Sequence, residues 1–486
     1  MKKKLFVFLI PILLITISLF PRKENKELVS NTDNLVSFTV DGVESKTMPT
    51  KGSGYIANKI TCKNGSIITF DNDNYIIEVE KLESADACKI DFSKEIGSNT
   101  VTVTISNRSK IDSTSKTTTE GGKVVFYLTG EPESITGGEY TLSSNKLIVN
   151  NIISNINLNI TMSKTLYDQL LIDNSRIKTR TDFDTTFTET NTGTLYKANE
   201  SIVGNTPKDV YYFAGDAKNN WVKFANFYWR IIRTNYDGSI RLLYAGTSPD
   251  TTSGYIGKSA FNTTKNDPMY VGYKYGTTGS LENNRLNTND STIKTYVDNW
   301  YKNNLTAYTK YLSNDAVYCN DRNLASGQTY STTSSFNYAP YERIYTNKQP
   351  TYNCTNMSDA FSVNNTSAKL NYPVGLMSID ELSYAGGQAG KSLTTPYAWY
   401  YTNANGESIT GIAPSWALSP YRWLGSSSIV WRVNGSDFPG RLVDGYVEYS
   451  MAVRPSVSLS SCNLISRGDG SPENPYEIYT GNGVCE

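Results

Sequence analysis

The chain has 486 residues with 46 Lys or Arg and 46 Asp or Glu, and its hydrophobic fraction of 38% predicts several modest cores rather than one large core. It contains no histidine, which excludes Ser-His-Asp and Cys-His catalysis, HExxH zinc sites and histidine-based pH switching. Because no block of basic residues follows Lys26, the sequence predicts no nucleic-acid partner.

Residues 1–27 have the arrangement of an export signal. A basic start precedes the apolar run Leu5–Phe20. The run is longer than a signal core of about 7–15 residues and shorter than the roughly 20 residues of a membrane span. Cleavage and retention as an N-terminal membrane anchor therefore both stay open. Either outcome predicts an extracellular or cell-surface location, with membrane contact only through an uncleaved signal.

Two small β modules are predicted next, over residues 28–93 and 94–164. Short apolar or alternating runs such as residues 66–70 and 101–105 are separated by turn signals. Both modules look like the immunoglobulin-like spacers of bacterial surface proteins. Their expected role is to form a stalk.

A connector over residues 165–205 and a larger α+β domain over residues 206–486 complete the expected organisation. The connector combines one stripe of leucines at helical spacing with Thr-rich sequence. In the domain, two strands flank the turn at residues 235–238 as a hairpin. One helix is expected to begin at Ser291, and a second at the capping box in residues 378–381.

Six cysteines fall into three pairs that are close in sequence. These are Cys62 with Cys88, Cys319 with Cys354, and Cys462 with Cys485. An even number of cysteines in an exported chain predicts disulfides. A metal site is the alternative, but the sequence has no CxxC motif and no histidine to complete one. We therefore expect three disulfides, no metal and no cofactor.

Short motifs are spread along the C-terminal part of the chain, each weak alone and specific as a set. They occupy residues 221–224, 227–233, 237–238, 319–322, 372–376, 380–381, 385–387, 416–420, 453–455, 468–470 and 474–476. As a set they resemble a domain of unknown function in surface proteins of low-GC Gram-positive bacteria. That domain is similar to the C-type lectin-like superfold, and the resemblance covers residues 165 to 480.

The resemblance implies a compact α+β domain with two helices and a twisted sheet. It also places residues 416–453 on the ligand-facing side. The Glu-Pro-Asn, Gln-Pro-Asp and Trp-Asn-Asp motifs of calcium-dependent sugar binding are missing from the domain. The reactive cysteine pair of formylglycine-generating enzymes is also unmatched, because Cys319 and Cys354 are predicted to form a structural bridge. Neither activity of the superfold is therefore expected.

Residues 421–449 combine arginines and aromatic residues with small spacers, the composition of a paratope. Alternation along residues 429–433 is expected to place Arg432 on the face opposite Trp431. The candidate ligand-binding residues are Tyr421, Arg422, Trp423, Arg432, Asp437, Phe438, Arg441, Asp444, Tyr446, Glu448 and Tyr449. The alternative is a polar, turn-rich sheet edge without a ligand.

The expected function is a non-enzymatic cell-surface binding or adhesion protein with an unidentified glycan or protein ligand. Domains of this fold are targets of diversity-generating retroelements, which alter Asn codons, and only Asn434 remains between Ser415 and Ser456. A structural envelope protein without a specific ligand is the first alternative. A glycan hydrolase is the second, with Asp380 and Glu381, or Asp437 and Asp444, as its carboxylate pair.

Overall fold

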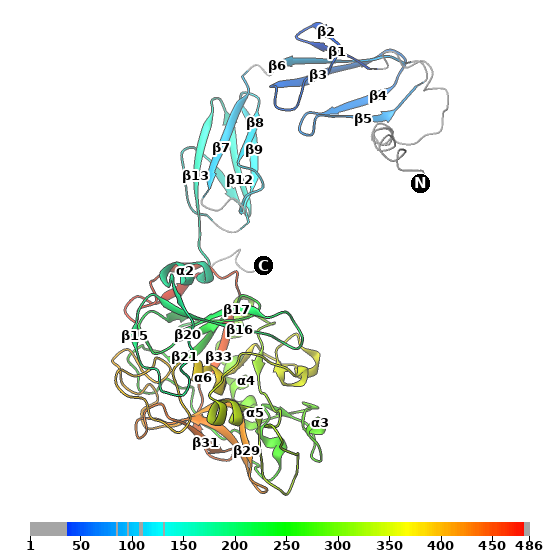
Figure 1. Ribbon diagram of the computed structural model, residues 1–486. Helices are drawn as coiled ribbons and strands as arrows, with labels where there is room; N and C mark the ends of the chain where they lie inside the picture. The colour runs from blue at the N-terminus through cyan, green and yellow to red at the C-terminus, as the bar shows by residue number, and fades with distance from the viewer. Residues whose placement is uncertain (1–35, 84–85, 95–96, 106–109, 130–131, 481–486) are drawn as a thin grey trace, which may run out of the picture. The chain divides into compact units, whose positions relative to one another are not determined.

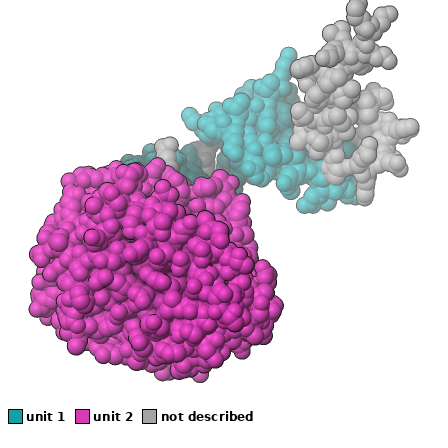
Figure 2. Space-filling view, turned by 60° about the horizontal axis from the view of Figure 1, so that its bottom comes forward, with its two compact units in different colours: residues 1–162 teal, residues 163–486 magenta. Residues whose placement is uncertain are grey.

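The computed structural model describes residues 36–83, 86–94, 97–105, 110–129 and 132–480. The chain divides into two compact units, residues 1–162 and 163–486, which are blue to cyan and green to red in Figure 1 and teal and magenta in Figure 2. The protein is predominantly β, because 40% of its residues are in strands and 13% are in helices. The strands form many sheets. Within the described part no helix is long and apolar enough to cross a membrane. The export signal predicted for residues 1–27 lies outside the described residues.

The described residues of the first module of unit 1 form six strands. They are β1 Val36–Val40, β2 Val43–Ser45, β3 Tyr55–Cys62, β4 Ile67–Asp71, β5 Ile76–Lys81 and β6 Cys88–Lys94. A four-stranded sheet in the order β2-β1-β6-β3 packs on the hairpin β4-β5 around Ile68, Ile90 and Phe92. Cys62 and Cys88 lie opposite each other on β3 and β6 and form a disulfide. The bridge supports a module whose buried core is small.

Seven strands are formed by the part of the second module that the structure describes. They are β7 Asn99–Ile105, β8 Ser115–Thr118, β9 Gly122–Tyr127, β10 Pro132–Thr136, β11 Thr141–Ser143, β12 Lys146–Ile152 and β13 Ile156–Met162. One sheet has the order β10-β13-β7-β8 and the other β11-β12-β9. Alternating residues such as Val101, Phe126 and Leu158 point from both sheets into one shared core.

The strands of unit 2 are β14 Arg176–Lys178, β15 Thr190–Asn191, β16 Thr194–Glu200, β17 Lys208–Tyr212, β18 Asp216–Ala217, β19 Trp221–Phe224, β20 Phe227–Thr234, β21 Ile240–Gly246, β22 Lys258–Ser259, β23 Lys274–Tyr275, β24 Asn289–Asp290, β25 Tyr318–Cys319, β26 Phe336–Asn337, β27 Ala360–Phe361, β28 Val374–Leu376, β29 Ser415–Trp423, β30 Ser428–Val433, β31 Leu442–Tyr446, β32 Met451–Ala452, β33 Pro455–Leu459, β34 Ile465–Arg467 and β35 Tyr476–Ile478. Its helices are α2 Leu166–Asp173, η3 Pro268–Val271, α3 Leu281–Asn284, α4 Thr292–Asn304, η4 Thr306–Tyr311, α5 Ala339–Tyr341, η5 Glu342–Asn347, η6 Met357–Asp359, η7 Thr366–Ala368 and α6 Ile379–Tyr384.

Two large sheets organise unit 2. The ten-stranded sheet follows the order β14-β16-β17-β20-β19-β35-β34, and β21, β33 and β28 extend it from β20. The six-stranded sheet has the order β22-β32-β29-β30-β31, with β26 paired to β29. In Figure 1, β16, β17 and β20 lie near α2, whereas β29 and β31 lie at the opposite end of the unit. A single core that includes Trp229, Val297 and Trp431 joins the two sheets and α4.

The local signals predicted for unit 2 are confirmed. Strands β20 and β21 pair antiparallel around the turn. Helix α4 begins after Ser291, whose side chain accepts a hydrogen bond from the Lys294 amide, and it buries Ile293, Val297 and Tyr301. Helix α6 begins with the complete capping box of Ser378 and Glu381. These features could be predicted because each depends on a few neighbouring residues.

Two expectations are changed by the structure. Residues 165–205 are not a separate connector, because β16 pairs with β17 inside the ten-stranded sheet and the whole segment belongs to unit 2. The α+β expectation for residues 206–486 is correct only in part. The longest helix of the unit, α4, has 13 residues, and the chain is predominantly β. The pairing that places β14 and β16 in the sheet joins segments that are separated in sequence, so few short sequence patterns predict it.

Two of the three predicted disulfides are seen directly. They are Cys62–Cys88 and Cys319–Cys354, which close loops of 26 and 35 residues. Cys462 is also disulfide-bonded, and its predicted partner Cys485 lies outside the described residues.

Candidate functional site

The candidate residues of the sequence lie on three neighbouring strands of the six-stranded sheet, in the connection between β30 and β31, and just after β31. Strands β29, β30 and β31 pair antiparallel, and β31 is at the edge. The register sets Arg422 opposite Ile429, and Asp444 opposite Trp431. Because paired residues share a face and neighbours alternate, Arg422 and Asp444 belong to one face and Arg432 to the other. The structure therefore divides the candidates between two faces of one edge.

Two of the predicted contact residues belong to the core. Trp423 has no exposed surface, and Tyr421 is 5% exposed. The Tyr421 ring packs edge-on against the Trp431 ring with centroids 4.5 Å apart. The assignment of Trp423 as a ligand contact is therefore wrong, since a side chain with no exposed surface cannot reach a ligand. Composition alone cannot distinguish an aromatic side chain that points inward from one that points outward.

The remaining candidates reach the surface to different degrees. Phe438 and Tyr449 are 50% and 52% exposed, and Asp437 and Asp444 are also exposed. The half-buried candidates are Arg422, Arg432, Arg441, Tyr446 and Glu448. Glu448 already accepts a hydrogen bond from Lys265 at 2.6 Å. It is therefore less available to a ligand than the others.

The first face carries a stacked group that we call the Arg422 platform, formed by Tyr341, Tyr345 and Arg422. The Arg422 guanidinium lies 5.6 Å from the Tyr341 ring centroid. Tyr341 stacks in parallel on Tyr345 with centroids 5.2 Å apart and 10° between the rings. Tyr345 is 47% exposed. Such stacking holds a guanidinium in place while its polar edge stays free.

The sequence interpretation missed Tyr341 and Tyr345 because they precede the candidate stretch by about 80 residues. They are supplied by α5 and η5, and β26 brings that segment to β29 by pairing with Trp423 and Arg422. One signal was available, since the two tyrosines are four residues apart, the spacing of one helical face. Burial would lower the pKa of Arg422, but its hydrogen bond to the Tyr421 hydroxyl and the smaller effects of Tyr341 and Asp444 raise that pKa above its ordinary value.

The opposite face carries a second group, the arginine pair Arg432 and Arg441. The Asn434 amide donates to the Arg441 carbonyl at 2.9 Å, which continues the β30–β31 ladder and sets Arg441 diagonally across from Arg432. Arg432 Nε donates to the Asp444 carbonyl at 2.7 Å, and the Arg441 guanidinium lies 5.5 Å from the Phe438 ring centroid. Burial lowers the pKa of Arg432, and the charge of Arg441 adds to that effect.

Ion pairs of Arg343 with two buried carboxylates hold the segment that carries the Arg422 platform. Arg343 of η5 donates to both carboxylate oxygens of Asp380, at 3.0 and 2.8 Å, and to Asp321 at 2.6 Å. The Cys319–Cys354 disulfide ties the same segment to β25. The tyrosines of the platform are therefore fixed by the fold, as preorganised binding requires.

Asp380 and Glu381, one pair considered for catalysis, both form ion pairs with arginines inside the fold. Glu381 is 2% exposed and accepts hydrogen bonds from Arg233 and Arg241, each at 2.9 Å. Burial alone would raise its pKa, but the two arginines hold the pKa below its ordinary value. The neighbouring cavity has a volume of about 20 Å³. That volume accommodates a water molecule and is too small for a sugar.

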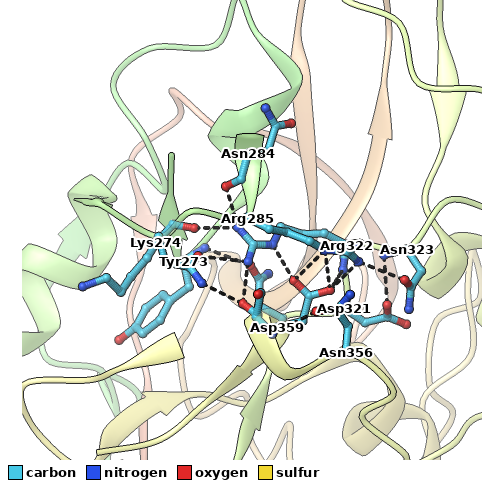
Figure 3. Close-up of polar contacts among 12 residues, drawn as sticks. Tyr273, Lys274, Asn284, Arg285, Asp321, Arg322, Asn323, Asn356 and Asp359 are labelled. Atoms are coloured by element: carbon cyan, nitrogen blue, oxygen red, sulfur yellow. Dashed lines mark hydrogen bonds and ion pairs between the residues drawn. The ribbon is translucent and has the colours of Figure 1, made fainter. Parts of the chain in front are cut away.

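A second buried network fixes the motif at residues 319–322, as Figure 3 shows. Asp359 accepts hydrogen bonds from Arg322 Nε at 2.7 Å and from Arg285 Nη2 at 2.6 Å. Arg322 Nη1 donates to the carbonyls of Lys274 and Asn284, at 2.9 and 3.1 Å, and Nη2 donates to the side-chain oxygen of Asn287 at 3.0 Å and to the Ser358 carbonyl at 2.8 Å. Both arginines are paired with Asp359 and hydrogen-bonded within the fold, so we interpret the motif as structural.

Among the described residues, one group has the spacing of metal ligands, namely Cys62, Asp86 and Cys88. Its two sulfur atoms are bonded to each other, so they are not available as thiolate ligands. Asp86 instead accepts hydrogen bonds from the amides of Asn64 and Ser66, which lower its pKa to about 2 against the opposing effect of burial. These residues therefore stabilise the first module.

These features define the class of the protein as a β-rich chain of two compact units with internal disulfides. Comparison with protein-family models, with curated proteins and with solved structures finds no match.

Proposed function

We propose that the protein is an exported cell-surface binding protein and not an enzyme, and that unit 2 binds an extracellular ligand at the edge formed by β29, β30 and β31. The observation that supports this most strongly is the set of arginines that form no ion pair among the described residues and that lie near half-exposed aromatic rings. Tyr345, Phe438 and Tyr449 each expose about half of their surface. Rigid aromatic side chains beside arginine are enriched where proteins bind tightly.

The proposed location follows from the disulfides and the predicted signal. Disulfides form and persist in oxidising compartments outside the cytoplasm, and the described cysteines include no free thiol. The proposed architecture is the one implied by the sequence resemblance, with immunoglobulin-like modules in unit 1 and a C-type lectin-like frame in unit 2. In this arrangement unit 1 acts as a stalk.

A screen of the purified chain against glycan and protein arrays tests the proposal. We expect a hit that weakens when Arg422 or Tyr345 is replaced by Ala, while the thermal midpoint of unfolding is unchanged. Arg176→Ala is a matched control, because this exposed arginine belongs to β14 of the other large sheet. A spacer without a specific ligand predicts no hit. Binding losses that parallel stability losses would also contradict the proposal.

Diversification by a retroelement is a further proposal for the same surface. The exposure of each residue determines which positions are expected to vary. Variation is expected at exposed positions such as Asp437, Phe438 and Tyr449, whereas the buried Tyr421 and Trp423 are expected to stay constant. Comparison of natural copies of the gene tests this expectation. A neighbouring template repeat and reverse transcriptase gene would support it, and variation spread evenly along the chain would contradict it.

A further inference from the structure

Arg432 and Arg441 lie diagonally across β30 and the start of β31, and burial lowers the pKa of Arg432 more than the charge of the nearby Asp444 raises it. Among the described residues neither arginine takes part in an ion pair, and their contacts are the Asp444 carbonyl and the Phe438 ring. Like charges on neighbouring strands repel each other and destabilise a sheet. The fold therefore gains no ion-pair stabilisation from these two arginines, in contrast to the arginines that hold Glu381 and Asp359.

Hydrogen-bonding capacity remains on both guanidinium groups. Arg432 uses Nε for the Asp444 carbonyl, and no hydrogen bond to its two terminal nitrogens is formed within the described part of the chain. The two terminal nitrogens of Arg441 also form no hydrogen bond among the described residues, and only its Nε atom is both buried and without a partner. A planar guanidinium fork matches the two oxygens of a carboxylate, and such pairs are short and strong.

Exposed rings lie beside the arginines. The Phe438 ring packs against the Arg441 guanidinium and is 50% exposed. Tyr449 is 52% exposed and lies near enough to Arg432 to affect the pKa of that arginine, and its ring packs against Tyr446 with centroids 5.4 Å apart. A flat aromatic ring can pack against the C–H face of a sugar ring, and the arginines can bind acidic substituents on that sugar. This combination fits a sugar with a carboxylate better than a neutral sugar or a free inorganic anion.

The backbone of β31 is poorly suited to a peptide that would add as an extra strand. The Leu442 carbonyl accepts a hydrogen bond from the Gly390 amide at 2.8 Å, and residues 389 and 442 already form a bridge. The Asp444 carbonyl accepts from Arg432. Strand addition needs free backbone groups along an edge. Recognition through side chains is therefore favoured at this edge.

We propose that the arginine pair binds the carboxylate groups of an acidic glycan, a polymer of uronic acid residues. This inference rests on the proposed binding function of unit 2 and names the class of its ligand.

The test measures binding of the purified full chain to immobilised polygalacturonate, to its methyl-esterified form and to polyglutamate, at low and at physiological salt. We expect binding to polygalacturonate alone, weakening as salt screens the charges. Arg432→Gln and Arg441→Gln are each expected to weaken it about tenfold, the change that follows loss of one hydrogen bond between charged groups. Arg432→Lys should restore less than full affinity because it keeps the charge and loses the fork. Arg176→Gln is the matched control and should bind as the wild type does.

The outcomes separate this inference from the proposed function. Equal binding to the methyl ester would overturn the carboxylate specificity and leave the binding function standing. Equal binding to polyglutamate would overturn the glycan class. No binding to any of the three polymers would overturn the inference, while a hit on the wider array that depends on Arg422 would still support a binding surface.

Discussion

The arginines of unit 2 occupy two contrasting environments. We call the buried ion pairs of the core the frame. In it the side chains of Arg233, Arg241 and Arg322 are each 3% exposed or less, and each pairs with a carboxylate that is equally buried. At the β30–β31 edge, Arg432 and Arg441 are half-buried and have no such partner among the described residues. The same side chain thus stabilises the fold in one place and remains available for binding in the other. This difference predicts opposite responses to substitution.

The largest effect is expected at Asp359. Replacing it by Ala leaves Arg322 and Arg285 as uncompensated buried charges, which should lower the free energy of unfolding by about 3–5 kcal/mol. Denaturant titration of the purified chain measures this change. Asp209→Ala is the control, because its ion pair with Lys197 is exposed and is expected to contribute less than about 1 kcal/mol. Similar losses in both variants would contradict the distinction between frame and edge.

A loss of about 3–5 kcal/mol is also expected for Trp423→Ala, because the whole indole ring is buried and its removal leaves a cavity. Phe438→Ala, at the exposed end of the same region, should change the free energy of unfolding by no more than about 0.5 kcal/mol. Thermal and denaturant unfolding of the two variants measure the difference. A Trp423→Ala variant that keeps its stability but loses binding would show that Trp423 contacts the ligand after all.

Glu381 predicts a pH-dependent effect of intermediate size. Its folded pKa lies below the ordinary value of 4.5 because Arg241 and Arg233 outweigh the effect of burial. The carboxylate therefore stabilises the fold above the unfolded pKa, and this contribution is lost as the pH falls through the folded pKa. The stability difference between the wild type and Glu381→Gln should be full at pH 7 and shrink below pH 4.5. A difference independent of pH would show that the charge contributes nothing.

A smaller effect is expected at the capping box of α6. Ser378→Ala removes the hydrogen bond to the Glu381 amide and should cost about 1 kcal/mol, whereas Ser378→Gly should cost only a few tenths. Chemical unfolding of both variants checks the order. Equal losses would indicate that the Ser378 side chain acts through packing instead of capping.

Local features of the fold could be predicted from the sequence, and long-range features could not. The hairpin β20–β21, the start of α4 and the capping box of α6 each depend on residues within a few positions of one another. The pairing of β14 with β16, and that of β26 with β29, joins segments whose contact no short pattern encodes. Long-range pairing is also why residues 165–205 were mistaken for a connector.

The candidate surface shows the same limit. The composition of residues 421–449 identified Arg432, Arg441, Phe438 and Tyr449, which the structure brings to one edge. It also selected Trp423, since composition carries no information on which way a ring points. Tyr345 was missed because β26 and η5 bring it to β29 from a distant part of the chain.

The most direct test of the contrast between frame and edge is one double variant, Arg432→Gln with Arg441→Gln, measured for both stability and binding. We predict a free energy of unfolding within about 0.5 kcal/mol of the wild type, together with loss of binding to polygalacturonate. A loss of several kcal/mol, comparable to that of Asp359→Ala, would show that these arginines belong to the frame and would contradict the account.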